Sequence, residues 1–145
     1  MITDDGEHGE PGGNQIQQPP KPMTSGVHRW LANIAYAILL VVMAVLPSTS
    51  RVAVVSVPDW FAHATAYGGQ AALLYWASLP LLGHRRSLAV GLFGATAFGV
   101  VTETLQLAQP RRFVEVKDLA ANTIGALLVC GVIGGAGQLG WRRGR

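Results

Sequence analysis

Charge and cysteine are scarce in this sequence. Of its 145 residues 13% are charged, about half of the roughly 25% typical of soluble domains, while 50% are apolar. The single cysteine, Cys130, excludes an internal disulfide and a cysteine-based zinc cage, and its apolar surroundings predict a small core residue. The basic residues form no face or stripe of the kind that binds nucleic acid, so no nucleic-acid partner is expected. This composition is typical of a membrane protein.

The N-terminal region has no apolar periodicity. Residues 1–27 are acidic at first, with four of the eight Asp and Glu residues in the first ten positions, and then rich in Gly, Gln and Pro. This composition predicts a disordered tail. The tail also lacks the short basic start of a secretory signal peptide, so we interpret the first apolar run as a retained membrane anchor.

Four apolar runs follow the tail. Each is close to the ~20 residues that a helix needs to cross a bilayer, and none has the wide polar face of a soluble bundle. The runs are Trp30–Leu46, Trp60–Leu82, Leu88–Ala108 and Leu119–Trp141. Because the links are short, we predict an all-α fold in which residues 28–145 form an antiparallel bundle of four transmembrane helices.

The basic residues predict the orientation of this bundle. Four antiparallel spans would divide the basic residues into two sets on opposite sides of the membrane. The first comprises Lys21, Arg29, Arg85, Arg86, Arg142, Arg143 and Arg145, and the second Arg51, Arg111, Arg112 and Lys117. The larger set is expected inside, which places both termini in the cytoplasm of a multi-pass protein.

Small residues recur four positions apart in the third and fourth runs. The repeats are Gly91, Ala95 and Gly99, then Ala121 and Gly125, then Gly131 and Gly135. Such spacing allows close helix packing within the bundle and also offers faces for a homo-oligomer. Pro80 is expected to kink or end the second span.

Polar side chains interrupt three of the four runs at helical spacing. The second run carries Asp59, His63, Tyr67 and Gln70 on one stripe, the third carries Glu103 and Gln106 on one face, and the fourth carries Asp118 and Asn122 with Gly125 in line behind them. In the predicted topology all three polar faces lie near the outer surface, below a loop that contains Arg111 and Arg112. Ionisable residues inside a membrane are costly to bury and mark candidate functional sites.

Each of these residues also has a purely structural interpretation. Asp59 and Asp118 stand where they could cap the second and fourth helices. His63 could be a satisfied core or interfacial histidine, Glu103 could form a structural pair with Arg111 or Arg112, and a lone tyrosine such as Tyr67 is usually packing. All of these residues are expected at the same depth in the membrane, which favours a shared pocket over separate structural roles.

Two blocks of the sequence resemble the VanZ-like family of membrane proteins. VPDWFAHATAY resembles the motif P-D-x-x-x-H-x-x-x-Y, and ETLQLAQPRRFVEVKDLAANTIG resembles E-x-x-Q, then R, then D-x-x-x-N-x-x-G. The resemblance covers residues 57–132 and implies a small polytopic protein of the bacterial inner membrane. The implied polar positions are Asp59, His63, Tyr67, Glu103, Gln106, one arginine, Asp118, Asn122 and Gly125. Spacing favours Arg112 over Arg111, and the acidic tail departs from the family pattern.

Three functions fit this site, and we rank binding first. A pocket at the outer leaflet would hold a lipid headgroup or a lipidated, envelope-directed molecule, with arginine contacting an anionic group; the family's link to teicoplanin resistance implies a contribution to glycopeptide tolerance. The second is a membrane enzyme that acts on a lipid-linked phosphate or acyl unit, with His63 as acid or base oriented by Asp59 or Glu103. Proton-coupled transport through Glu103 and His63 ranks last. The spacing is not diagnostic of a metal, so neither a metal nor another cofactor is expected.

Overall fold

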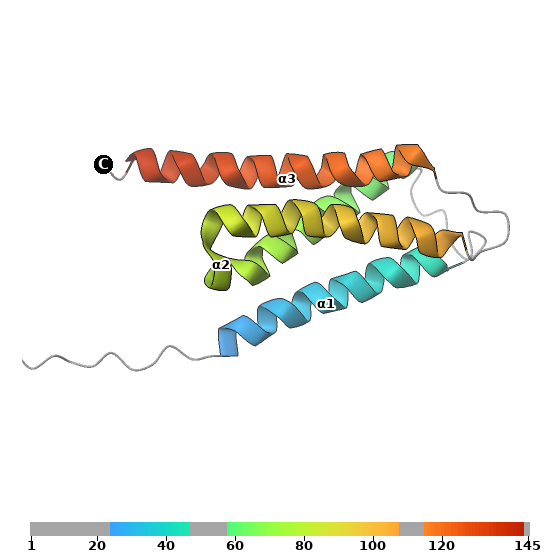
Figure 1. Ribbon diagram of the computed structural model, residues 1–145, viewed down its shortest axis with the longest axis horizontal. Coiled ribbons are helices and arrows are strands. Elements are labelled where there is room, and N and C mark those ends of the chain that lie inside the picture. Colours follow the sequence, from blue (N-terminus) through green and yellow to red (C-terminus); the bar gives the residue numbers. More distant parts are fainter. Residues whose placement is uncertain (1–23, 47–57, 108–114, 144–145) are drawn as a thin grey trace, which may run out of the picture.

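The chain is helical throughout its described parts. The computed structural model describes residues 24–46, 58–107 and 115–143, and within these ranges it contains three helices and no strand (Figure 1). Helix α1 spans Thr24–Val45, α2 spans Asp59–Gln106 and α3 spans Val116–Arg143. The all-helical prediction is therefore confirmed. All three helices are long and apolar enough to cross a membrane.

Helix α1 begins earlier than the sequence predicts. Its first residue is Thr24, so residues 24–27, expected to end the disordered tail, are helical; residues 1–23 lie outside the described part of the chain. Contacts with α2 hold this end of α1. The Arg29 guanidinium donates from Nη1 to the Trp76 carbonyl at 3.2 Å, and its Cζ lies 5.0 Å from the centroid of the Trp76 ring. The helix therefore begins before the apolar run, and Arg29 in its second turn anchors it to α2.

Helix α2 folds back on itself at Gly83. A straight helix of its 48 residues would be about 72 Å long, far more than the ~30 Å hydrocarbon core of a bilayer. Gly83 instead adopts φ 71° and ψ 173°, a conformation that is essentially restricted to glycine. The break divides α2 into an N-terminal arm, residues 59–82, and a C-terminal arm, residues 84–106. The helix continues past Pro80, so glycine rather than proline ends this arm.

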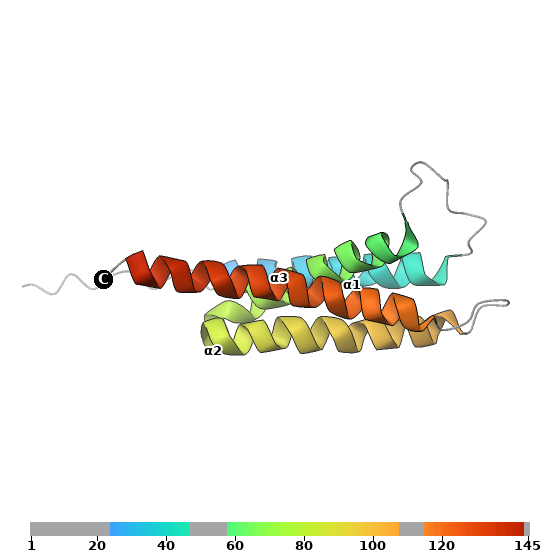
Figure 2. The ribbon, with the colours of Figure 1, turned by 90° about the horizontal axis from the view of Figure 1, so that it is seen from above.

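The two arms of α2 run antiparallel (Figures 1 and 2). Near the turn the Tyr75 hydroxyl and His84 Nδ1 are hydrogen-bonded at 3.0 Å, and far from it Tyr67 is hydrogen-bonded to Thr102. The start of α1, the turn at Gly83 and the end of α3 lie at one end of the molecule in both views. The end of α1, both ends of α2 and the start of α3 lie at the other.

The backbone of α3 lies in close contact with the backbone of the N-terminal arm of α2. A Cβ atom added to Gly125 would lie 1.9 Å from the Ala64 carbonyl oxygen, and one added to Gly68 would lie 3.2 Å from the Gly125 carbonyl oxygen. Further along, Cys130 is buried in a small cluster with three alanines, Ala71, Ala95 and Ala126. Small residues thus pack these helices together, and Cys130 is the core residue that the sequence predicts.

The other small-residue repeats divide between the core and the surface. Gly91 and Gly99 are buried, and an added Cβ at Gly91 would lie 2.7 Å from the Ala71 carbonyl oxygen. Gly131 and Gly135 are exposed, and no atom of the described residues lies within 4 Å of a Cβ placed on either. The repeat of Gly91, Ala95 and Gly99 therefore packs inside the bundle, whereas Gly131 and Gly135 lie on an open face of α3.

Helix α1 packs on α2 and has no contact with α3 within the described ranges. A buried amide pair fixes it there: Gln70 Nε2 donates to Asn33 Oδ1 at 3.1 Å. The Tyr36 hydroxyl donates to the Ala66 carbonyl at 3.1 Å. Its remaining surface exposes large apolar side chains such as Leu31 and Ile38, which is the surface expected of a helix in contact with lipid.

Two alanine substitutions in α3 test the backbone contact. Alanine has a higher helix propensity than glycine by ~1 kcal/mol, so Gly131→Ala at the open position should leave stability unchanged or raise it. Gly125→Ala forces Ala64 away and should lower the free energy of unfolding by about 1–3 kcal/mol. Unfolding of both variants in detergent, followed by circular dichroism, measures the difference. Equal stability of the two variants would contradict the contact.

Candidate functional site

His63 lies at the centre of a cluster of polar side chains from α2 and α3. Its Nδ1 is 3.0 Å from Asn122 Oδ1 and 3.6 Å from Glu103 Oε1. Its Nε2 is 3.9 Å from Asp118 Oδ2. The N-terminal arm of α2 supplies the histidine, the C-terminal arm supplies the glutamate, and α3 supplies the other two groups. Three segments far apart in the sequence therefore meet at one imidazole.

The carboxylates around His63 account for most of the acidic residues beyond the first ten positions. Those residues are Asp59, Glu103, Glu115 and Asp118. Glu115 is exposed and forms an ion pair with Lys117, whereas the other three lie near His63. Glu103 is 2% exposed and Asp118 is 5% exposed. Carboxylates are costly to bury in apolar surroundings, so this concentration makes the cluster around His63 the candidate functional site of the described chain.

The neighbours of His63 determine which nitrogen carries a proton. Asn122 Oδ1 and Glu103 Oε1 both face Nδ1, and both are acceptors. Nδ1 therefore carries the hydrogen and donates it to Asn122 Oδ1. Nε2 then faces Asp118 either with a lone pair, in the neutral ring, or with a second hydrogen, in the imidazolium. The ring is held in one orientation while Nε2 stays available for proton transfer or coordination.

Neither aspartate serves as a helix N-cap. The N-cap of α2 is Pro58, without a side-chain capping bond, and Asp59 is the first helical residue. In α3 the backbone N–H groups of Asp118 and Leu119 donate to the Glu115 carbonyl, so Asp118 already lies in the first turn. Both aspartates nonetheless lie in the first turn of a helix.

Tyr67 lies one helical turn after His63 in α2. It links His63 to Thr102, a residue that the sequence did not identify as part of the site. The Tyr67 ring is stacked with the His63 ring, with 6.3 Å between centroids, and its hydroxyl is hydrogen-bonded to Thr102. Thr102 is 0% exposed and also donates to the Gly99 carbonyl at 2.9 Å. Its position beside Glu103 is the one signal that could have drawn attention to it.

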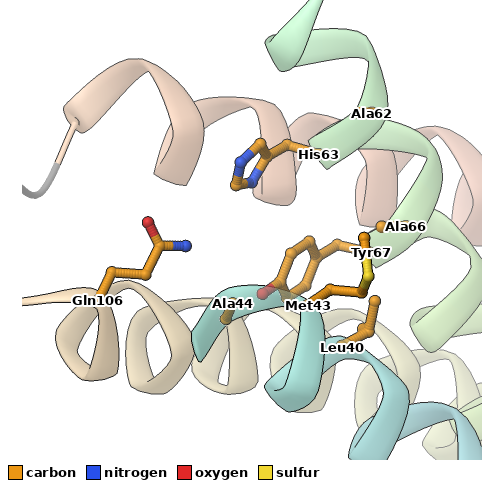
Figure 3. Close-up of a pocket in the computed structure, with 8 residues that line it drawn as sticks. All are labelled: Leu40, Met43, Ala44, Ala62, His63, Ala66, Tyr67 and Gln106. Carbon is orange, nitrogen blue, oxygen red and sulfur yellow. The ribbon is translucent and has the colours of Figure 1, made fainter. Parts of the chain in front are cut away.

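A cavity opens next to His63 between α1 and the two arms of α2 (Figure 3). It has a volume of about 170 Å³ and is lined by Leu40, Met43, Ala44, Ala62, His63, Ala66, Tyr67 and Gln106. The side chains of His63, Tyr67 and Gln106 point toward it from α2, whereas α1 contributes apolar groups (Figure 3). The cavity therefore has a polar side and an apolar side.

The structure does not bring every predicted residue to this centre. Gln70 shares the stripe of His63 but turns to α1, where it bonds to Asn33. Asn33 is a second residue that sequence reasoning missed, although an asparagine in an otherwise apolar run is itself a signal. Arg111 and Arg112 lie outside the described residues, so their place at the site stays a prediction.

Comparisons of the chain with models of protein families, with curated proteins and with solved structures found no match.

Proposed function

We propose that this protein is a VanZ-like integral membrane protein that binds the polar head of a lipid, or of a lipidated envelope-directed molecule, at the outer leaflet. The observation that carries the proposal is the two-sided cavity beside His63. His63 and Gln106 offer hydrogen bonds to a polar head, while Leu40 and Met43 of α1 lie where an acyl chain would continue into the membrane. An amphiphile, with a polar head and an apolar tail, is the kind of ligand that matches both the polar and the apolar side of this cavity.

The size of the cavity supports a headgroup rather than a whole ligand inside the protein. At ~30 Å³ for each water in the liquid, about 170 Å³ holds a group the size of a few waters. A phosphate or a short polar head fits this space, and the rest of the molecule would lie along the exposed apolar face of α1. That face carries Ile38, Leu39 and Val42, each about half exposed.

The sequence adds charge and context to this proposal. Arg111 and Arg112 precede α3 in the chain, and one of them would contact an anionic head in the proposed site. The resemblance to the VanZ-like family extends the proposal to lipidated glycopeptides, with a contribution to tolerance of teicoplanin-type antibiotics. The small residues of the open α3 face, Gly131 and Gly135, are the proposed surface for self-association.

Four membrane spans and cytoplasmic termini complete the proposal. Each arm of α2 is about 35 Å long at 1.5 Å per residue, enough for the ~30 Å hydrocarbon core. Basic residues gather at one end of the molecule, with Arg29 near the start of α1, Arg85 and Arg86 at the turn, and Arg142 and Arg143 at the end of α3. The positive-inside rule assigns this end to the cytoplasm of a bacterial inner membrane.

A second candidate function is acid–base catalysis on a lipid-linked phosphate or acyl substrate. The orientation of His63 favours it, because Nδ1 is fixed by Asn122 and Nε2 lies near a carboxylate, while the side chain keeps 16% of its surface accessible. An imidazole held in this way can take a proton from, or give one to, a substrate in the adjacent cavity. Asp59 and Glu103 would act as its orienting carboxylates.

Reporter fusions test the topology. Green fluorescent protein placed after Arg145 or inserted beside Arg86 should fluoresce, because both positions are assigned to the cytoplasm. Alkaline phosphatase should be active when inserted near Arg112, on the opposite side. The reverse pattern, or fluorescence at only one of the first two positions, would contradict four spans with cytoplasmic termini.

Filling the cavity should abolish ligand binding. Ala62 is exposed and lines the cavity, so Ala62→Phe places a ring there without disturbing the buried core. Ala89, an exposed alanine of the other arm that does not line this cavity, gives the matched control Ala89→Phe. Native mass spectrometry with an anionic phospholipid, a polyprenyl phosphate and teicoplanin should show binding to the parent and Ala89→Phe chains, reduced at least tenfold in Ala62→Phe. Equal retention by both variants would exclude this cavity as the site.

The enzymatic candidate predicts turnover that depends on the histidine. Purified protein should release phosphate or fatty acid from the same lipids, and His63→Ala should lower the rate by about 10²–10⁴-fold. Glu103→Gln should also lower it, whereas His84→Ala, at a histidine near the turn of α2, should not. Full rates in His63→Ala would remove this candidate and leave binding unaffected.

A further inference from the structure

Asp59, His63 and Asp118 bring three potential metal ligands close together. Each residue offers one ligand atom, and these atoms all lie within 4.8 Å of one another. Asp59 and His63 are one helical turn apart in α2, and Asp118 comes from the first turn of α3. Their spacing in the sequence indicates nothing about a metal, because the packing of α3 on α2 forms the group.

His63 is arranged as metal-binding histidines usually are. Such a histidine binds the ion through one nitrogen while the other donates its hydrogen to a carbonyl or carboxylate oxygen. Here Nδ1 faces Asn122 Oδ1 at 3.0 Å and Glu103 Oε1 at 3.6 Å, so it is the donor. In the neutral ring Nε2 presents its lone pair near Asp118 Oδ2, at 3.9 Å.

Asp118 supplies an independent observation. Its side chain is more than nine-tenths buried, and Oδ1 has no hydrogen-bond partner in the described structure. Proteins rarely bury a carboxylate oxygen in that state, because the lost hydration is not replaced. The other oxygen of the same carboxylate is the one near His63 Nε2. A cation beside both oxygens would replace the lost hydration of Asp118.

The charged groups around these three residues favour a cation over an anion. Both aspartates lie in the first turns of their helices. Lys117, which directly precedes Asp118 in the chain, is exposed and forms an ion pair with Glu115. Glu103 adds a further negative group on the Nδ1 side of the ring.

We propose that Asp59, His63 and Asp118 form a binding site for a divalent transition-metal ion, with Zn²⁺ as the first choice and Mn²⁺ as the second. One imidazole and two carboxylates are a donor set that suits these ions. In a tetrahedral site with metal–ligand distances of ~2.0–2.2 Å the ligand atoms lie roughly 3.3–3.6 Å apart. The three groups, within 4.8 Å of one another here, would therefore draw together around the ion, chiefly through the exposed Asp59 side chain. Three protein ligands leave a coordination position open for water. The site is independent of the amphiphile proposal, because it needs no occupant in the cavity.

Titration calorimetry of the full chain tests the site. The protein is purified in detergent without a histidine tag, stripped with a chelator and titrated with Zn²⁺ or Mn²⁺. All variants carry His8→Ala, because the acidic N-terminal sequence around His8 offers ligands of its own. One saturable equivalent of metal is expected, with affinity lowered at least tenfold by Asp59→Asn and by Asp118→Asn. Asn122→Ala, which removes the acceptor for Nδ1, should lower it by about 10–100-fold.

Matched controls separate this site from general attraction to acidic residues. Glu115→Gln removes a carboxylate near the start of the same helix, and His84→Ala removes a histidine from the same element as His63; both should bind like the parent. Asp59 is exposed, so Asp59→Asn should keep its helical circular dichroism even where Asp118→Asn unfolds. Absence of saturable binding, or parent-like affinity in folded Asp59→Asn, would overturn the proposal. Neither result bears on lipid binding by the cavity. The Ala62→Phe experiment measures that binding separately.

Discussion

The site depends on one close contact, that between Gly125 of α3 and the Ala64 carbonyl of α2. Ala64 is the neighbour of His63, while Asp118 and Asn122 occupy the two turns before Gly125 on the same face of α3. When the two backbones touch at this point, the register of α3 is fixed and Asn122 reaches Nδ1 of the histidine. A side chain at position 125 would push α3 outward and separate its polar groups from His63.

The fold-back of α2 supplies the third side of the site. Gly83 reverses the chain, so that the C-terminal arm returns along the N-terminal arm and sets Thr102 beside Tyr67 and Glu103 beside His63. The cost of burying Glu103 and Asp118 is thereby shared within one cluster. Away from this cluster the same helices expose apolar side chains over most of their length.

The proposed functions share His63, whose Nδ1 is bonded to Asn122 and whose Nε2 is left for a ligand. The cavity toward α1 has an apolar wall and suits an amphiphile, whereas Nε2 lies near Asp118, which groups with Asp59 as a potential metal site. A cation held by those aspartates would attract an anionic head toward the cavity, as the arginines before α3 would. Electrostatic attraction of a phosphate and apolar contact with its lipid tail are therefore compatible in one site.

The sequence by itself determined that the chain is helical and apolar enough for a membrane, because run length and hydropathy are local properties. It also grouped Asp59, His63 and Tyr67 on one stripe and Asp118, Asn122 and Gly125 on another, since helical periodicity alone sets those faces. Only the tertiary structure decided which stripes meet. It sent Gln70 to Asn33 rather than to the cluster and brought Thr102 to Tyr67. These outcomes depend on how closely two backbones approach and on which buried polar group finds a partner, and neither is encoded in the spacing of a single helix.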